Sequence, residues 1–274
     1  MTRRLITDAV FLGILCVLAG LLLVPLGLIF YYIVSKGMTV LSWQFLTSMP
    51  VSAGEPGGGI LNAIVGTLMS VFNASLVAIP IGITVGIYLY EYQTGILSAV
   101  VRFCVEILQG VPSIVIGIVV YLWCVVPFGH FSSWAGSLAL AMMMLPVMIR
   151  NTEETLKLIP QSLKEASLAL GVSYPKTILK VILPTGMRGI VSGAMLAISR
   201  VSGETAPLLF TAFGNPFLSF DPSKPIQTIP LLVFNYATSP YPDWQAMAWG
   251  ASLVLVGFVL MLNLATQWIA KKRF

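Results

Sequence analysis

The sequence predicts an all-α, polytopic membrane protein whose chain crosses the membrane six times. Hydrophobic residues make up 57% of the 274 residues and charged residues only 9%, whereas a soluble domain usually carries about 25% charged residues. Most of the apolar residues fall in runs that approach or exceed the roughly 20 residues that an α-helix needs to cross a bilayer. We expect six spans, at residues 9–34, 60–90, 98–126, 134–149, 185–213 and 244–269.

Composition and cysteine usage exclude several classes of protein. The net charge is +5, but the basic residues are spread among loops rather than gathered in one patch, so we expect no nucleic-acid partner. The three cysteines, Cys16, Cys104 and Cys124, lie in apolar runs, and the sequence contains no Cys-x-x-Cys motif or histidine cluster. We therefore expect neither a disulfide nor a metal site.

The first span follows the basic residues Arg3 and Arg4 and covers 9–34. It is longer than the roughly 7–15 apolar residues of a signal peptide. We interpret it as an uncleaved span with a cytoplasmic N-terminus. Residues 1–56 then comprise this span and the first extracytoplasmic loop, and residues 57–274 form a core of five spans.

The second span, at 60–90, is long enough to be tilted, or kinked at Pro80, and Glu91 marks its cytoplasmic end. Its Gly82 and Gly86 form a small-xxx-small pair, which permits two helices to approach closely. We expect this face of the span to pack against a neighbouring helix.

The third span contains a charged pair and an interruption. Arg102 and Glu106 stand four residues apart near its inner end, where they could pair with each other. Residues 109–113 (Gln-Gly-Val-Pro-Ser) interrupt the apolar run, and such a break is tolerated only where it faces protein or a water-filled cavity. Pro112 and Ser113 are therefore candidate pathway residues, although a simple packing kink explains the break equally well.

The positive charges indicate which side of the membrane each loop faces. Under this layout, Lys36 and Lys224 fall outside and Arg200 falls within a span. Twelve other basic residues fall inside or at the inner boundary: Arg3, Arg4, Arg102, Arg150, Lys157, Lys164, Lys176, Lys180, Arg188, Lys271, Lys272 and Arg273. This bias predicts a plasma-membrane protein in contact with lipid, with both termini in the cytoplasm.

A charged cytoplasmic segment at 151–184 separates the fourth and fifth spans. The stretch from Arg150 to Arg188 holds nine of the chain's 15 basic and 10 acidic residues. A segment with this much charge must contact water or a partner.

The same segment has the signals of two short helices. Ser162 and Glu165 have the spacing of a capping box, Gly171 suits the left-handed residue that ends a helix, and Ser173 could cap a second helix. One face of the first helix is apolar: Leu163, Ala166 and Leu170. A helix, a glycine turn and a helix with one apolar face are suited to docking on another protein.

The fifth span carries Arg200 and Glu204, one helical turn apart and hence on one face. Counted from Thr185 at 1.5 Å per residue, Arg200 lies about 22 Å along the helix, within the bilayer. An uncompensated arginine costs roughly 2.5–3.5 kcal/mol at the centre of a bilayer. Either the two side chains form a structural ion pair, or Arg200 meets a passing anion, whose oxygens suit a guanidinium, while Glu204 restrains it.

Glu165-Ala166-Ser167, Gly171 and Leu183-Pro184 together resemble the EAA loop of ABC-importer permeases in residue type and spacing. The chain departs from that pattern with Ser167 in place of alanine and Val181 in place of isoleucine. The resemblance implies a fold like that of the type I ABC importer permeases, in which this loop docks on the ATPase subunit. With Ser162 from the capping box, the residues that we expect to act in ATPase coupling are Ser162, Glu165, Ala166, Ser167, Gly171, Leu183 and Pro184.

The stretch from Arg200 through Gly203-Glu204-Thr205-Ala-Pro-Leu-Leu-Phe looks like the signature of the PstA-type phosphate permeases. Gly57-Gly-Gly-Ile, Asn62-Ala-Ile and Gly110-Val-Pro-Ser-Ile add to this resemblance, which extends over about residues 57–213. It implies a role in phosphate transport for Arg200 and Glu204. With Thr205, Pro112 and Ser113, they are the candidate pathway residues.

The same resemblance implies the composition of a larger complex. The expected partners are a second, homologous permease, two ATPase subunits and an extracytoplasmic phosphate-binding protein. ATP and Mg would then bind the ATPase subunits, and this chain would be a transport subunit without a cofactor or an enzymatic site of its own. The alternatives are a permease for another oxyanion, such as sulfate or molybdate, and a secondary transporter that works alone.

Overall fold

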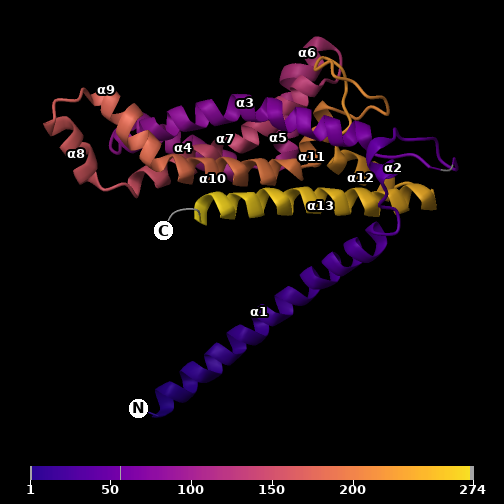
Figure 1. Cartoon of the computed structure of the whole chain (residues 1–274), viewed down its shortest axis with the longest axis horizontal. Helices are drawn as coiled ribbons and strands as arrows, with labels where there is room; N and C mark the ends of the chain where they lie inside the picture. Colours follow the sequence, from indigo (N-terminus) through magenta and orange to yellow (C-terminus); the bar gives the residue numbers. More distant parts are fainter. Residues whose placement is uncertain (1, 56, 272–274) are drawn as a thin grey trace.

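The computed structural model describes residues 2–55 and 57–271. These residues form a bundle of helices without a strand, apart from an isolated bridge between Phe213 and Ile226 (Figure 1). The elements are α1 (Thr2–Gly37), α2 (Trp43–Thr47), α3 (Leu61–Glu91), α4 (Ile96–Gly110), α5 (Ser113–Val120), η1 (Tyr121–Val125), α6 (Val126–Phe128), α7 (Ser133–Lys157), α8 (Gln161–Ala169), α9 (Tyr174–Thr177), η2 (Ile178–Ile182), α10 (Leu183–Ser202), α11 (Ala206–Thr211), α12 (Ile229–Ala237) and α13 (Pro242–Lys271).

The all-α, polytopic fold predicted from the sequence is confirmed. Within the described part of the chain, five stretches are long and apolar enough to cross a membrane: Val10–Gly37, Leu61–Glu91, Ser133–Lys157, Tyr174–Ser202 and Pro242–Trp268. The third predicted span is instead a bent pair, Ile96–Gly110 and Ser113–Phe128, with 106° between its two helices. Counted as one span, the pair completes the predicted six.

The bend falls at residues 111–112, within the predicted interruption at 109–113. Val111 is extended (φ −70°, ψ 129°) and Pro112 is the N-cap of α5. A proline disfavours the helical conformation in the residue before it and supplies no N–H to the helix. The local sequence therefore ends α4 and starts α5 in a new direction.

The fourth helix is longer than predicted. We expected it to end at residue 149, but α7 continues to Lys157. The added residues include Thr152, Glu153 and Leu156, which are buried, so the helix continues because one of its faces still packs on the bundle. Residues 151–157 therefore belong to this helix and not to a separate cytoplasmic loop.

The fifth span begins earlier and ends earlier than the predicted 185–213. It runs as one helical stretch from Tyr174 to Ser202 through the π-helical turn η2. Pro184 explains this turn, because its missing N–H leaves the preceding carbonyls to bond in a different register. The span stops at Ser202 because Pro207 lies ahead, and its ring would clash with the carbonyl of Gly203 in a continuous helix.

The centre of the bundle is the contact between α3 and α7. A methyl group on Gly82 would clash with Met148, and one on Gly86 would clash with Thr152. The predicted close packing of this face is therefore confirmed, with α7 as the partner helix. Around it lies a core that α10 and α11 complete with Ala194, Ala197, Val201 and Leu208.

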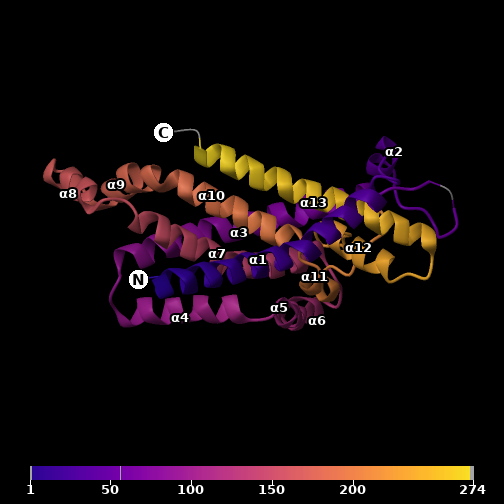
Figure 2. The same ribbon diagram turned by 90° about the horizontal axis from the view of Figure 1, so that it is seen from below.

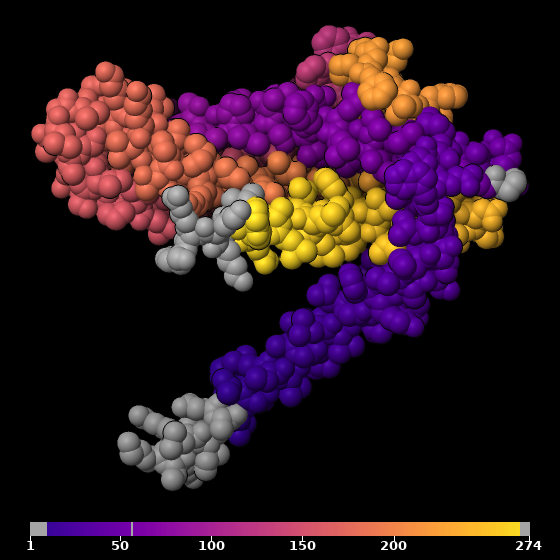
Figure 3. Space-filling view, in the orientation of Figure 1, coloured from indigo at the N-terminus to yellow at the C-terminus, as the bar shows by residue number. Residues whose placement is uncertain are grey.

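The first helix, α1, leaves the bundle. None of the most apolar window of its span is buried within the chain, and it touches the rest of the protein near Gly37, which packs on Leu253 of α13. Figure 3 shows α1 projecting from the body, and Figure 2 shows α1 running lengthwise across the bundle when the protein is seen from below. Of the basic residues at the C-terminus, Lys272 and Arg273 lie outside the described residues.

Candidate functional site

The first group of candidate residues lies where two spans are interrupted. Glu204 and Thr205 belong to the irregular turn between α10 and α11, and Pro112 and Ser113 open α5. The Ser113 side chain lies close enough to the Glu204 carboxylate to interact with it. The structure therefore brings four of the five predicted pathway residues together at facing breaks.

The two breaks are held together by backbone packing. Gly117 of α5 lies against Pro207 of α11, where an added methyl group would come within 2.7 Å of the proline Cα. Only a glycine allows this approach. The contact fixes the N-terminal turn of α5 beside Glu204, so Ser113 is in place to interact with the carboxylate.

Arg200, the fifth predicted pathway residue, lies in the last turn of α10 and is exposed. The prediction that Arg200 and Glu204 share one helical face is wrong, because the helix ends at Ser202 and Glu204 follows the break. Among the described residues, the guanidinium has no carboxylate within 4.0 Å. The charge of Arg200 is thus presented at the surface of the chain instead of being consumed in a tight ion pair.

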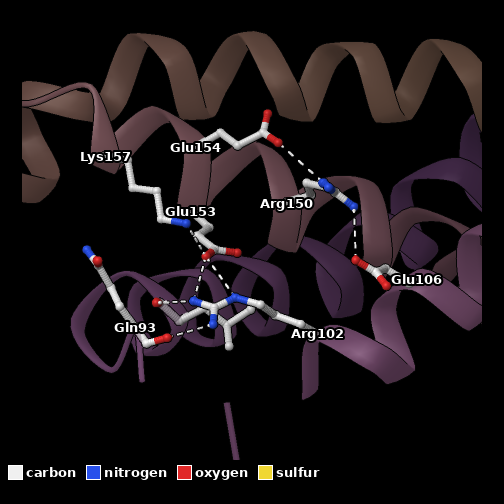
Figure 4. A network of polar contacts seen from close by, with 8 residues as sticks. Gln93, Arg102, Glu106, Arg150, Glu153, Glu154 and Lys157 are labelled. Atoms are coloured by element: carbon white, nitrogen blue, oxygen red, sulfur yellow. Dashed lines mark hydrogen bonds and ion pairs between the residues drawn. The ribbon is translucent and has the colours of Figure 1, made fainter. Parts of the chain in front are cut away.

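A second charged group lies where α4 and the end of α7 meet (Figure 4). Arg102 of α4 donates to Glu153 Oε1 from Nη2 at 2.8 Å and from Nε at 3.1 Å. It also donates to the backbone oxygens of Leu89 at 3.0 Å and Gln93 at 2.9 Å. Lys157 adds a second cation 2.6 Å from the same Glu153 oxygen. This arginine therefore ties the turn between α3 and α4 to the end of α7.

The predicted pairing of Arg102 with Glu106 is wrong. Arg102 pairs with Glu153, while Glu106 lies 3.9 Å from Arg150. Burial explains the choice, since the Glu153 side chain is 9% exposed and that of Glu106 is 62% exposed. A buried carboxylate needs a compensating cation far more than an exposed one does. The four-residue spacing of Glu153 and Lys157 was the signal in the sequence that this end of α7 holds charge.

The coupling segment has the predicted order of helix, glycine turn and helix: α8, Gly171 and α9. Gly171 has φ 78°, so the predicted left-handed residue is confirmed. The predicted capping box is wrong, because Pro160 is the N-cap of α8 and Ser162 lies inside the helix. The N-cap at Pro160 therefore precedes the predicted N-cap, Ser162, by two residues.

Ser173 is the N-cap residue of α9, as predicted, but its side chain makes no capping hydrogen bond. Ser167, the departure from the EAA pattern, has a role of its own: its hydroxyl lies 2.9 Å from that of Thr177, and both residues are buried. This hydrogen bond closes α8 on α9.

Most of α8 faces outward. Glu165 and Ala166 are exposed, and Leu170 is 85% exposed. Leu183 and Pro184 begin α10, so the segment leads directly into the helix that carries Arg200. The predicted apolar face is therefore free of contacts within the chain that would bury it.

The family described as "Binding-protein-dependent transport system inner membrane component" matches residues 78–274. The phosphate transport system permease protein PstA of Yersinia pestis is 42% identical over 89% of this chain and 83% of its own length. The probable PstA of Methanocaldococcus jannaschii is 37% identical over 98% of this chain and 96% of its own length.

Solved structures with the same fold include an inward-facing form of the MetNI methionine ABC transporter. That chain aligns with a TM-score of 0.65 at 23% identity, over 77% of this chain and 94% of its own. A second crystal form of the same transporter gives a TM-score of 0.57. At this level of identity the likeness concerns the fold alone.

Proposed function

Because this chain belongs to the family of binding-protein-dependent transport system inner membrane components, we propose that it is the permease subunit of an ATP-driven importer for inorganic phosphate. The observation that carries the proposal is one helical stretch, Tyr174–Ser202. It continues the coupling segment at one end and presents Arg200 at the other, beside the interrupted spans. A motion of the segment is thus passed directly to the site where we expect the anion to cross.

The pathway residues suit an oxyanion. A guanidinium offers five N–H donors in a planar fork that matches phosphate oxygens. Its charge offsets the cost of bringing an anion into a medium of low dielectric. The Glu204 carboxylate would limit the strength of binding by placing a negative charge next to the site. The identity to PstA proteins supports phosphate over sulfate or molybdate.

The exposed face of α8 suits an ATPase partner. We propose that Glu165, Ala166 and Leu170 contact one of two ATPase subunits, which bind ATP and Mg and carry out hydrolysis. A second, homologous permease would complete the pathway, and an extracytoplasmic binding protein would deliver phosphate. Alternating access follows if closure of the ATPase pair moves α8 and, through it, the Tyr174–Ser202 stretch.

The positive-inside bias supports one orientation. We propose a bacterial or archaeal cytoplasmic membrane, with both termini and the α8–α9 end in the cytoplasm. In that orientation the loops around α2 and α12, at the opposite end of the bundle in Figure 1, face the binding protein.

The test is uptake of labelled phosphate by the complete complex in liposomes that contain ATP. We expect uptake that requires both ATP and the binding protein, and unlabelled phosphate should compete far better than sulfate or molybdate. Uptake of sulfate or molybdate in place of phosphate would overturn the substrate. Uptake by this chain without an ATPase would overturn the importer class.

A further inference from the structure

One ion pair links the coupling segment to a span other than its own. Lys164 of α8 lies against Glu91, the last residue of α3: its Nζ is 2.8 Å from Glu91 Oε2 and 3.1 Å from Oε1. The same Nζ donates to the Tyr174 hydroxyl at 3.0 Å. The three N–H donors of the ammonium group thus match three acceptor atoms, two on Glu91 of α3 and one on Tyr174 of α9.

The surroundings of this pair set it apart from a surface salt bridge. The side chains of Lys164 and Glu91 are 23% and 7% exposed. The ring centroids of Tyr174 and Tyr90 lie 4.8 Å and 5.5 Å from Nζ, close enough for the rings to favour a cation there. Tyr90 in turn packs with Ile178 and other buried residues of the inner end. We call Lys164, Glu91, Tyr90 and Tyr174 the Lys164 joint.

The joint connects α8 to a rigid helix that runs the length of the bundle. At 1.5 Å per residue, the 31 residues of α3 span about 46 Å. At the far end, Asn62 donates to the backbone oxygen of Asn215 at 2.9 Å, and Thr67 accepts from the Ile229 N–H at 2.8 Å. The helix therefore reaches from the coupling segment to the outer loop and α12.

We propose that the Lys164 joint is a second route by which movement of the coupling segment reaches the membrane spans. Direct continuity carries the motion into α10, and the joint carries it into α3, which is packed on α7 through Gly82 and Gly86. Lys164 and Glu91 are positioning residues in this proposal, which rests on the proposed docking of α8 on an ATPase. Without the joint, α8 could follow the ATPase while α3 stayed behind.

The test compares phosphate moved with ATP consumed in the reconstituted complex. The variants are Lys164→Glu, Glu91→Lys and the double variant that exchanges the two charges. We expect each single variant to assemble and to hydrolyse ATP, but the phosphate moved per ATP should fall about tenfold, within the range of measured couplings between contacting residues. The double variant should recover to within about threefold of wild type, because the opposite charges meet again.

Arg150→Gln is the matched control, since it removes an exposed ion pair at the same end of the bundle. This variant should leave the amount of phosphate moved per ATP unchanged. An unchanged ratio in both single variants would overturn the proposal. An equal loss of hydrolysis and transport without recovery in the exchanged variant would also overturn it, because that pattern indicates a merely structural contact.

The proposed function fails in a different way from the joint. If the wild-type complex moves another oxyanion instead of phosphate, the proposed substrate is wrong. The amount of that oxyanion moved per ATP in the Lys164 and Glu91 variants then still tests the role of the Lys164 joint. If the complex moves no solute with ATP, the proposed function and the joint both fail.

Discussion

Arg102 and Arg200 are two arginines in the spans of one chain, and the protein treats them in opposite ways. Arg102 donates to the Glu153 carboxylate and to two backbone oxygens. Arg200 is exposed at the end of α10 and has no carboxylate within 4.0 Å among the described residues. One arginine is committed to the fold, and the other is presented at the edge of an interrupted span.

The difference follows from the helix ends on which they lie. Arg102 stands beside a turn that offers backbone oxygens and opposite a buried glutamate, so all three of its nitrogens donate within the chain. Arg200 stands before a break that carries its expected partner, Glu204, off the helix. A charged group without a tight partner in a membrane protein indicates function more strongly than a paired one. From this comparison we propose that Arg102 stabilises the fold and that Arg200 acts in transport.

The largest expected effect is the loss of transport in Arg200→Gln. Removing a preorganised charge from the path of an ion should lower phosphate uptake by roughly 100-fold, by analogy with the removal of a single oxyanion donor from an enzyme. Folding and assembly with the ATPase should be unchanged, since no ion pair within the chain is lost. Uptake in liposomes and co-purification with the ATPase measure the two properties.

Arg188→Gln is the matched control for Arg200→Gln, because Arg188 is exposed on the same helix, α10. We expect its uptake to remain within about twofold of wild type, as for most substitutions of an exposed residue. Equal uptake by the two variants would end the distinction between Arg200 and an ordinary surface arginine.

The sequence was sufficient to predict the features that depend on nearby residues. Pro112 predicted the break in the third span, and Gly171 predicted the turn of the coupling segment. Gly82 and Gly86 predicted the close contact of α3 with a neighbouring helix. Features that depend on distant residues were missed. Arg102 was paired with Glu106, four residues away, although Glu153 is the partner, because the burial of a carboxylate is decided by helix packing that the sequence does not display.

The end of the fifth span shows the same limit within a short distance. Arg200 and Glu204 have the spacing of one helical turn, and local periodicity predicts a continuous helix through both. Pro207 prevents that helix because its ring would clash with the carbonyl of Gly203. The residues that form the candidate site were identified, but their arrangement around the break depended on a proline that follows both of them.

A smaller effect, on stability, is expected of Glu153→Gln. The variant leaves Arg102 and Lys157 without the carboxylate that both contact. Loss of the hydrogen bonds from charged groups costs about 1.5–3 kcal/mol, and the partial exposure of the two cations puts the expected loss toward the lower end of that range. We expect a lower unfolding temperature of the purified complex, with uptake per folded complex close to that of wild type. A loss of uptake without a loss of stability would place Arg102 and Glu153 in the transport machinery and would erase the contrast with Arg200.

The smallest effect is expected of Arg150→Gln, which tests an exposed ion pair beside the buried Arg102–Glu153 pair. Arg150 contacts Glu154 at 3.3 Å and Glu106 at 3.9 Å, but its side chain is 48% exposed. Exposed ion pairs contribute at most about 1 kcal/mol, so the unfolding temperature should be nearly that of wild type. Measured beside Glu153→Gln, it separates the effect of burial from that of charge. Equal destabilisation by the two variants would mean that the network acts as one unit and that burial of Glu153 is not what commits Arg102 to the fold.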